Sequence, residues 1–154
     1  MLTCSNICFT ITRDRTQYRR VDPEIDGVSL TEMATTFEVS QGFDTAGGYS
    51  GLVIEYTGDL QRYFLGELRT KARRTIALLG CDACCENGCW PLLCHLWVTQ
   101  EKVYWKQFSQ PHRFERDYSR FGPFIFDGRQ YRQALKDLSA AYSALGVEPP
   151  QQIS

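Results

Sequence analysis

Histidine is scarce in this chain of 154 residues, which contains only His95 and His112. Chemistry that needs an imidazole base or ligand therefore depends on one of these two residues. A dominant charge of one sign is also lacking, because the formal net charge is −1, and broad binding of nucleic acid needs a basic surface. No stretch approaches the roughly 20 apolar residues of a membrane-spanning helix. We therefore expect neither a nucleic-acid partner nor a membrane partner.

Cysteine, by contrast, is abundant and clustered. Four of the seven cysteines fall in the stretch Cys81-Asp-Ala-Cys84-Cys85-Glu-Asn-Gly-Cys89, and a fifth follows at Cys94. An odd number of cysteines excludes complete internal pairing. The first twelve residues also lack the basic start of a secretory signal. Together these features predict reduced thiols and a cytoplasmic location.

Length and composition predict a single globular domain over residues 1–154, with a frayed tail at 149–154. Strands are predicted at 7–12, 75–80, 90–99 and 102–108, with a weaker partner at 17–25 and a last extended piece at 121–126. Helices are predicted after Ser29 and after Asp127, while 43–73 gives little pattern. The expected fold class is α+β, a mostly antiparallel sheet with an early and a C-terminal helix packed on it.

Several local signals give finer predictions. Ser29 with Glu32, and Asp127 with Gln130, have the spacing of capping boxes at helix starts. Asn87-Gly88 predicts a tight hairpin turn. Pro23 predicts that its strand is an edge strand or only a partial strand, because proline cannot donate to a neighbouring strand.

The tryptophans and the basic clusters have plain structural interpretations. Trp90, Trp97 and Trp105 are expected to pack in the core or on a sheet face. The basic residues gather in two clusters, one at Arg13, Arg15, Arg19 and Arg20, the other at Arg69, Lys71, Arg73 and Arg74. Both are expected to form solvated faces rather than phosphate sites.

The second half of the chain contains three distinctive motifs. They are Gly88-Cys89-Trp90-Pro91-Leu92, then Trp105-x-x-Phe108-x-Gln110-Pro111-His112-Arg113, then Gly122-Pro123-Phe124-x-Phe126-Asp127 before a tyrosine-containing helix. Together they resemble a family of small uncharacterised bacterial proteins. The resemblance implies a bacterial, cytoplasmic protein and carries no established activity.

The cysteine spacing favours a zinc site. Zn²⁺ takes four tetrahedral ligands from cysteine and histidine, often with a Cys-x₂-Cys pair. Cys81 and Cys84 have that spacing, and Cys89 can approach them across the predicted turn. His112, Cys85 or His95 could complete the set. The hypothesis is a site of Cys81, Cys84, Cys89 and His112 in a structural hairpin.

Other interpretations of the thiols stay open. Cys81-x-x-Cys84 or Cys84-Cys85 could carry redox chemistry. Cys89 or Cys81 could act as a nucleophile with His112 as its base. Cysteine also serves as a small buried apolar residue, which is the expected role of Cys4, Cys8 and Cys94.

The leading prediction is a non-enzymatic bacterial domain that acts through protein contacts, with a structural hairpin that holds zinc. The alternative is a thiol-dependent enzyme or redox sensor that uses Cys89 or Cys81 with His112.

Overall fold

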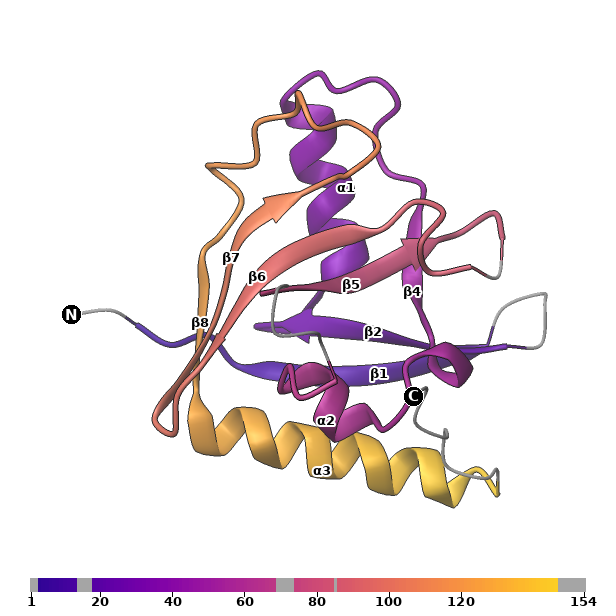
Figure 1. Cartoon of the computed structure of the whole chain (residues 1–154), viewed down its shortest axis with the longest axis vertical. Coiled ribbons are helices and arrows are strands. Elements are labelled where there is room, and N and C mark those ends of the chain that lie inside the picture. The colour runs from indigo at the N-terminus through magenta and orange to yellow at the C-terminus, as the bar shows by residue number, and fades with distance from the viewer. Residues whose placement is uncertain (1–2, 14–17, 69–73, 85, 147–154) are drawn as a thin grey trace.

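The computed structural model (Figure 1) describes residues 3–13, 18–68, 74–84 and 86–146. Its strands are β1 Ile7–Arg13, β2 Arg19–Ile25, β3 Val28–Ser29, β4 Tyr49–Val53, β5 Thr75–Cys81, β6 Leu92–Val98, β7 Lys102–Ser109 and β8 Phe124–Asp127. Its helices are α1 Leu30–Ser40, α2 Leu60–Phe64 and α3 Gly128–Ala144, with a 3₁₀ turn η1 at Ile54–Tyr56. The predicted α+β class is confirmed. The predicted tail at 149–154 lies outside the described residues.

One antiparallel sheet runs in the order β1-β2-β4-β5-β6-β7-β8, and β3 pairs with β2. The sheet curls until its two ends meet. Ser5, just before β1, forms a parallel bridge with Phe126 of β8, and its N–H donates to the carbonyl of Ile125 at 2.7 Å. This contact shortens the exposed edge that a long open sheet would leave.

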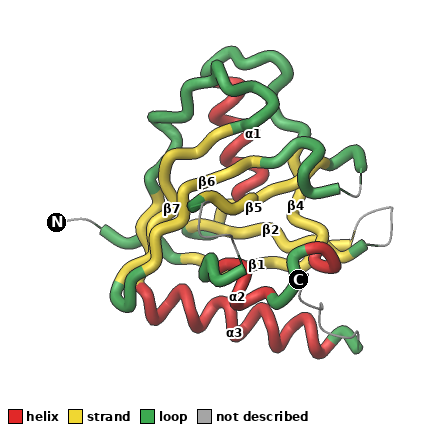
Figure 2. Tube along the Cα trace, viewed as in Figure 1, coloured by secondary structure: helices red, strands yellow, loops and turns green. Residues whose placement is uncertain are grey.

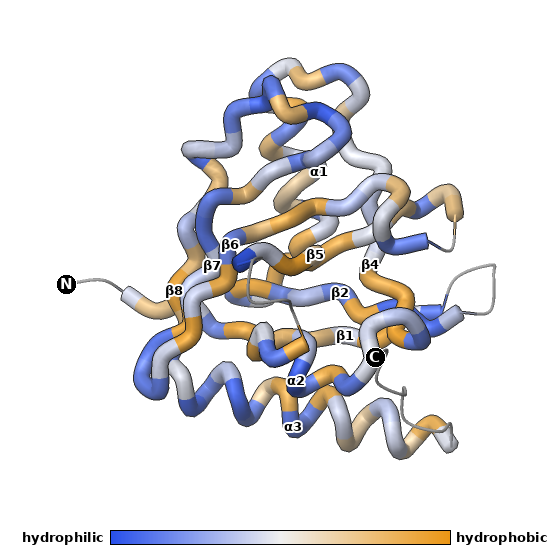
Figure 3. The backbone as a smooth tube through the Cα atoms, viewed as in Figure 1, coloured by the Kyte–Doolittle hydropathy of each residue, from blue (hydrophilic) through white to orange (hydrophobic). Residues whose placement is uncertain are grey.

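Helices α1 and α3 pack at different places on this curled sheet (Figure 2). Helix α1 contacts β2, β3 and β4, whereas α3 contacts β1, β7 and β8. A single core lies between them, and apolar residues follow the strands that surround it (Figure 3). Trp105 is fully buried there, with its ring 4.9 Å from that of Phe126 and 6.1 Å from that of Tyr131.

The alternation of residues along β6 predicts that Leu92, Cys94 and Leu96 share one face and that Trp97 lies on the other, and this is confirmed. Leu92, Cys94 and Leu96 are buried, while Trp97 on the opposite face is exposed. The same alternation along β7 predicts that Phe108 shares a face with Tyr104. That prediction is wrong, because Phe108 is buried with Trp105 instead. Gln107 has a φ of 53°, and this departure from extended backbone turns the following side chain inward.

Of the two alternatives that Pro23 allows, the edge position is wrong. Strand β2 lies between β1 and β4, and β1 is the edge. Pro23 falls between Arg20–Val21, which pairs with β4, and Glu24–Ile25, which pairs with β3. The missing N–H of proline is therefore tolerated, since no strand among the described residues pairs with β2 on that side at this position.

Each of the two predicted capping boxes is confirmed only in part. Ser29 precedes α1, but its hydroxyl donates to Asp22 at 2.6 Å and makes no cap. Asp127 does cap α3, accepting from the N–H groups of Arg129 and Gln130. The Gln130 side chain instead bonds both backbone groups of Ile7, accepting from its N–H and donating to its carbonyl, which ties α3 to the edge strand.

The segment 43–73, which gave little pattern, contributes β4, η1 and α2. Within the described part of the chain, no helix has the length and apolar character needed to cross a membrane.

Candidate metal centre

The connection between β5 and β6 carries most of the clustered cysteines. The two strands pair as predicted, but Asn87-Gly88 does not form a two-residue hairpin turn, because the connection extends from Asp82 to Pro91. Asn87 docks it on β4 instead: its Oδ1 accepts from the Val53 N–H at 2.8 Å and its Nδ2 donates to the Val53 carbonyl at 3.3 Å. A Cβ at Gly80 would lie 3.0 Å from that Oδ1, so glycine there admits the asparagine.

Three thiols converge at the start and end of this connection. The Sγ atoms of Cys81, Cys84 and Cys89 all lie within 4.8 Å of one another. A tetrahedral zinc with Zn–S bonds of about 2.3 Å needs sulfurs about 3.8 Å apart, so a small closing movement would bring them into coordination range. Cys81 is buried, Cys84 half-buried and Cys89 exposed. The three cysteines could therefore hold a metal ion at the surface.

The backbone around the thiols is firmly held. The Ala83 N–H donates to Cys81 Sγ at 3.4 Å. The buried Arg20 guanidinium reaches in from β2 and donates to the carbonyl of Cys81 at 3.1 Å and to that of Cys84 at 2.9 Å. Outer contacts of this kind orient metal ligands before the ion arrives.

The thiols also perturb one another. Hydrogen bonds with the Glu86 backbone and with the Cys89 thiol lower the pKa of Cys84 below its ordinary value of 9.0. Hydrogen bonding to Cys84 and Cys81 raises the pKa of Cys89 to about 12. These two pKa shifts of opposite direction are expected when the Cys89 thiol keeps its proton and donates a hydrogen bond to a Cys84 thiolate. Between these two residues, the thiolate is therefore favoured at Cys84.

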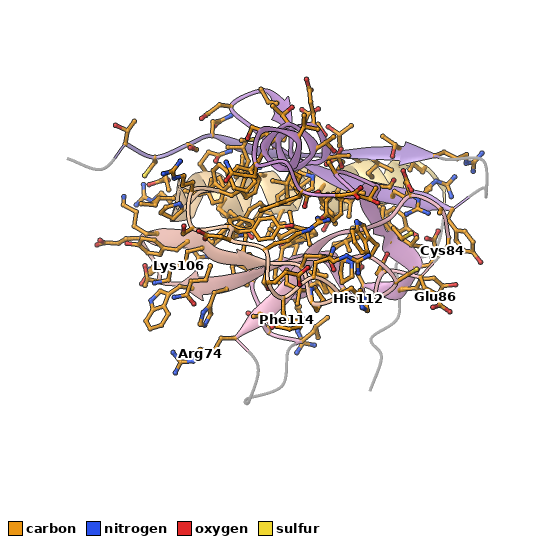
Figure 4. The ribbon with its side chains drawn as sticks, turned by 90° about the horizontal axis from the view of Figure 1, so that it is seen from above. Arg74, Cys84, Glu86, Lys106, His112 and Phe114 are labelled. Carbon is orange, nitrogen blue, oxygen red and sulfur yellow. The ribbon has the colours of Figure 1, made fainter. Side chains whose placement is uncertain are left out.

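His112 lies outside the group of three. Its Nε2 is 3.2 Å from the carbonyl of Gly88, and its ring stacks on Trp90 with an interplanar angle of 8°. Because a carbonyl only accepts, Nε2 carries the proton in this contact. Figure 4 shows Cys84 and Glu86 at one side of the molecule and His112 nearer its middle. The other histidine, His95, is bonded through Nδ1 to Gln107 on β7.

Two of the three sequence motifs, Gly88–Leu92 and Trp105–Arg113, meet at Trp90. Its indole N–H donates to the Gly47 carbonyl at 2.9 Å. The guanidinium carbons of Arg113 and Arg116 lie 5.2 and 5.6 Å from its ring centroid, close enough for cation–π attraction. The loop after β7 therefore packs directly on the residue that follows Cys89.

Sequence reasoning missed a buried carboxylate beside this contact. Glu38 is 0 % exposed. It accepts from the Tyr49 hydroxyl at 2.7 Å and from the Tyr118 hydroxyl at 2.5 Å, and it forms an ion pair with Arg116 at 3.4 Å. The spacing of Glu38 in the sequence could have indicated its burial. It follows Leu30 and Ala34 at intervals of four residues, and these three residues form the buried face of α1.

The remaining cysteines have separate environments. Cys94 is fully buried in the core, as expected. Cys8 is exposed rather than buried, and its thiol donates to Glu24 at 3.2 Å; Cys4 is half-buried. Cys85, one of the possible fourth ligands, lies outside the described residues.

Comparison with protein-family models, with curated proteins and with solved structures finds no match.

Proposed function

We propose that this chain is a non-enzymatic, protein-binding domain in which zinc fastens the Asp82–Pro91 connection. The convergence of three thiols within 4.8 Å carries the proposal. Cys81, Cys84 and Cys89 would bind as thiolates. His112 would supply the fourth ligand after a ring movement, since it already lies beside Gly88, the residue before Cys89.

The role of such an ion would be structural. Cys81 is the last residue of β5, Cys84 lies near the start of the connection and Cys89 near its end, so one ion would close the connection into a loop. The closed loop would hold Trp90, over which the guanidinium of Arg113 lies. Zinc binding would therefore stabilise the contact between the two motif-bearing loops.

Two observations support protein contacts over catalysis. Neither described histidine contacts a thiol: His95 bonds Gln107 and His112 bonds Gly88. Large aromatic side chains are exposed, with Phe114 at 91 % and Trp97 at 43 %. Exposed aromatic residues are enriched where proteins bind one another.

Elemental analysis of protein purified without chelator tests the zinc site. We expect about one zinc per chain, with thiols that react only after chelation or unfolding. Cys84→Ser should abolish stoichiometric zinc. Cys8→Ser is the matched control, because a hydroxyl there can still donate to Glu24, and it should leave the zinc content unchanged. Circular dichroism checks that both variants fold.

The alternative is a thiol redox sensor, favoured by the lowered pKa of Cys84 and by the closeness of its neighbours. In it, two thiols lose two electrons and two protons to an external disulfide such as oxidised glutathione and become one disulfide. Absence of zinc even after incubation with the metal, together with reversible loss of two thiols in glutathione buffers, would replace the zinc proposal with this one.

A further inference from the structure

The three clustered thiols form a ligand group that lacks a fourth member. The Sγ atoms of Cys81, Cys84 and Cys89 lie within 4.8 Å of one another, and no other cysteine, histidine, aspartate or glutamate of the described residues belongs to this group. Zinc in structural sites almost always takes four ligands. A zinc ion here therefore requires the ring movement of His112, whereas an ion that takes three ligands does not.

His112 is engaged where it lies. Its Nε2 is 3.2 Å from the Gly88 carbonyl oxygen, and its ring stacks on Trp90 with the ring centroids 6.3 Å apart. Its backbone N–H donates to Oε1 of Gln110 at 3.1 Å, and Gln110 is buried. Coordination through Nε2 would replace the hydrogen bond to Gly88, because both use the same nitrogen. Coordination by three sulfurs keeps all of these contacts intact.

Copper(I) suits a group of three thiols. It is a soft, singly charged ion, and thiolates are ligands that select it. Sulfur ligands alone complete its coordination, so it does not depend on an imidazole. We propose that Cys81, Cys84 and Cys89 also bind Cu(I), with three sulfurs and with His112 left on Trp90. The inference rests on the metal-binding half of the proposed function and adds a second ion to the same thiols.

Buried positive charge lies next to the ligand residues. The Arg20 guanidinium donates to the carbonyl of Cys81 at 3.1 Å and to that of Cys84 at 2.9 Å, and Arg20 is buried. Three thiolates carry more negative charge than one Cu(I) neutralises, and a nearby cation offsets part of this excess. The same hydrogen bonds fix the backbone of both ligand residues, so little ordering is required when the ion arrives.

The graded exposure of the thiols gives the ion a route of entry. Cys89 is exposed, Cys84 is half-buried and Cys81 is buried. A small thiol such as glutathione would carry Cu(I) to the surface and pass it first to Cys89. In each exchange one Cu–S bond to the chain forms and one to the donor breaks, while the proton of the cysteine passes to the departing donor sulfur. Copper stays Cu(I) throughout, so no oxidant or reductant is consumed.

Competition with a coloured Cu(I) chelator, bathocuproine disulfonate, measures the affinity of the full, reduced chain without oxygen. We expect about one Cu(I) per chain. Cys84→Ser should weaken binding by about tenfold or more, because a hydroxyl is a poor ligand for a soft ion. Cys8→Ser is the matched control, since Cys8 contacts Glu24 and not the three thiols. It should change the affinity less than about twofold, and so should Cys85→Ser.

Replacing His112 separates the two ions. His112→Phe keeps a ring that can stack on Trp90 but removes the ligand nitrogen. It should weaken zinc binding by about tenfold or more and Cu(I) binding by less than about twofold. In the unsubstituted chain, the imidazole nitrogen signals of His112 in NMR spectra should shift on addition of zinc and stay nearly unchanged on addition of Cu(I).

The two metal proposals can fail separately. Equal weakening of both ions by His112→Phe, or no Cu(I) taken from the chelator by protein that binds zinc, would overturn the copper inference alone. A loss of Cu(I) affinity in Cys8→Ser or Cys85→Ser as large as in Cys84→Ser would overturn the three-sulfur set. Cu(I) binding by protein that takes up no zinc would overturn the zinc site alone, and failure to bind either ion would overturn both. Circular dichroism establishes that every variant retains the fold.

Discussion

At the scale of single residues, the thiols of this chain differ in pKa as well as in exposure. Cys8 is exposed, yet partial desolvation and the hydrogen bond and charge of Glu24 raise its pKa to about 11. Cys84 is less exposed, yet its pKa is lowered by the Glu86 backbone and by Cys89. Reactivity follows the thiolate fraction and accessibility together, so exposure alone would rank these two residues in the wrong order.

We therefore expect iodoacetamide to label Cys84 before Cys8 and Cys89 in metal-free protein below pH 9. A lowered pKa gives more thiolate at a given pH, whereas the raised pKa values of Cys8 and Cys89 give less. Mass spectrometry of peptides after timed quenching measures the order, in a Cys85→Ser background that removes the adjacent thiol. Labelling of Cys8 at least as fast as Cys84 would contradict the expected thiolate. Added zinc should slow the labelling of Cys84 if the ion binds it.

At the scale of elements, the Asp82–Pro91 connection depends on a residue far away in sequence. Arg20 is 1 % exposed and donates to the carbonyls of Gly51, Cys81 and Cys84. It thus joins β2, β4 and the cysteine loop. Its sequence context, a basic cluster, predicted a solvated face instead. The local sequence could not predict that Arg20 is buried. Its acceptors are backbone carbonyls from other parts of the chain, and they come together only when the strands pair.

Arg20→Met should lower the free energy of unfolding by about 3 kcal/mol, since methionine fills similar space but leaves buried carbonyls without donors. Urea denaturation monitored by tryptophan fluorescence measures this loss. Zinc affinity should fall as well, because the carbonyls of two ligand residues lose their anchor. Arg19→Met on the same strand is the control and should cost less than about 1 kcal/mol. Equal effects in both variants would mean that Arg20 does not organise the loop.

Elements were predictable where periodicity was strong and less so where distant contacts decided the outcome. The alternation of β6 and the Asp127 cap of α3 were evident from sequence. The inward turn of Phe108 depends on the φ of Gln107, and the use of Gln130 depends on an edge strand over a hundred residues earlier. At the candidate site, spacing identified Cys81, Cys84 and Cys89. It did not reveal Arg20 or Glu38, whose partners come from other strands and loops.

At the scale of the whole molecule, buried tyrosine hydroxyls hold the parts of the fold together. Tyr49 and Tyr118 donate to Glu38 of α1. Tyr131 of α3 donates to the Phe64 carbonyl at 2.7 Å and accepts from the Trp105 indole at 3.2 Å. All three tyrosines are buried. Burial is the main cause that raises the pKa of each above the ordinary value of 10.0, and near Glu38 the hydrogen bond to its carboxylate adds to the effect.

This arrangement predicts a steep loss of stability in alkali. A raised pKa in the folded state means that the stabilising contribution is complete below pH 10 and is lost as pH rises from 10 toward the folded pKa values, because the unfolded chain releases these protons first. At a pH where a tyrosine is protonated in the folded chain but ionised in the unfolded chain, that tyrosine lowers the free energy of unfolding by about 1.4 kcal/mol per pH unit.

Urea denaturation at a series of pH values, paired with tyrosinate absorbance, measures both sides of this linkage. Tyr131→Phe should reduce the slope by about one proton, once its lower starting stability is subtracted. Tyr56→Phe, at an exposed tyrosine, is the matched control for the loss of one hydroxyl. Full tyrosinate absorbance while the chain is still folded would show that the hydroxyls ionise in place. The hydrogen bonds that join α1 and α3 to the rest of the fold would then not be what fails in alkali.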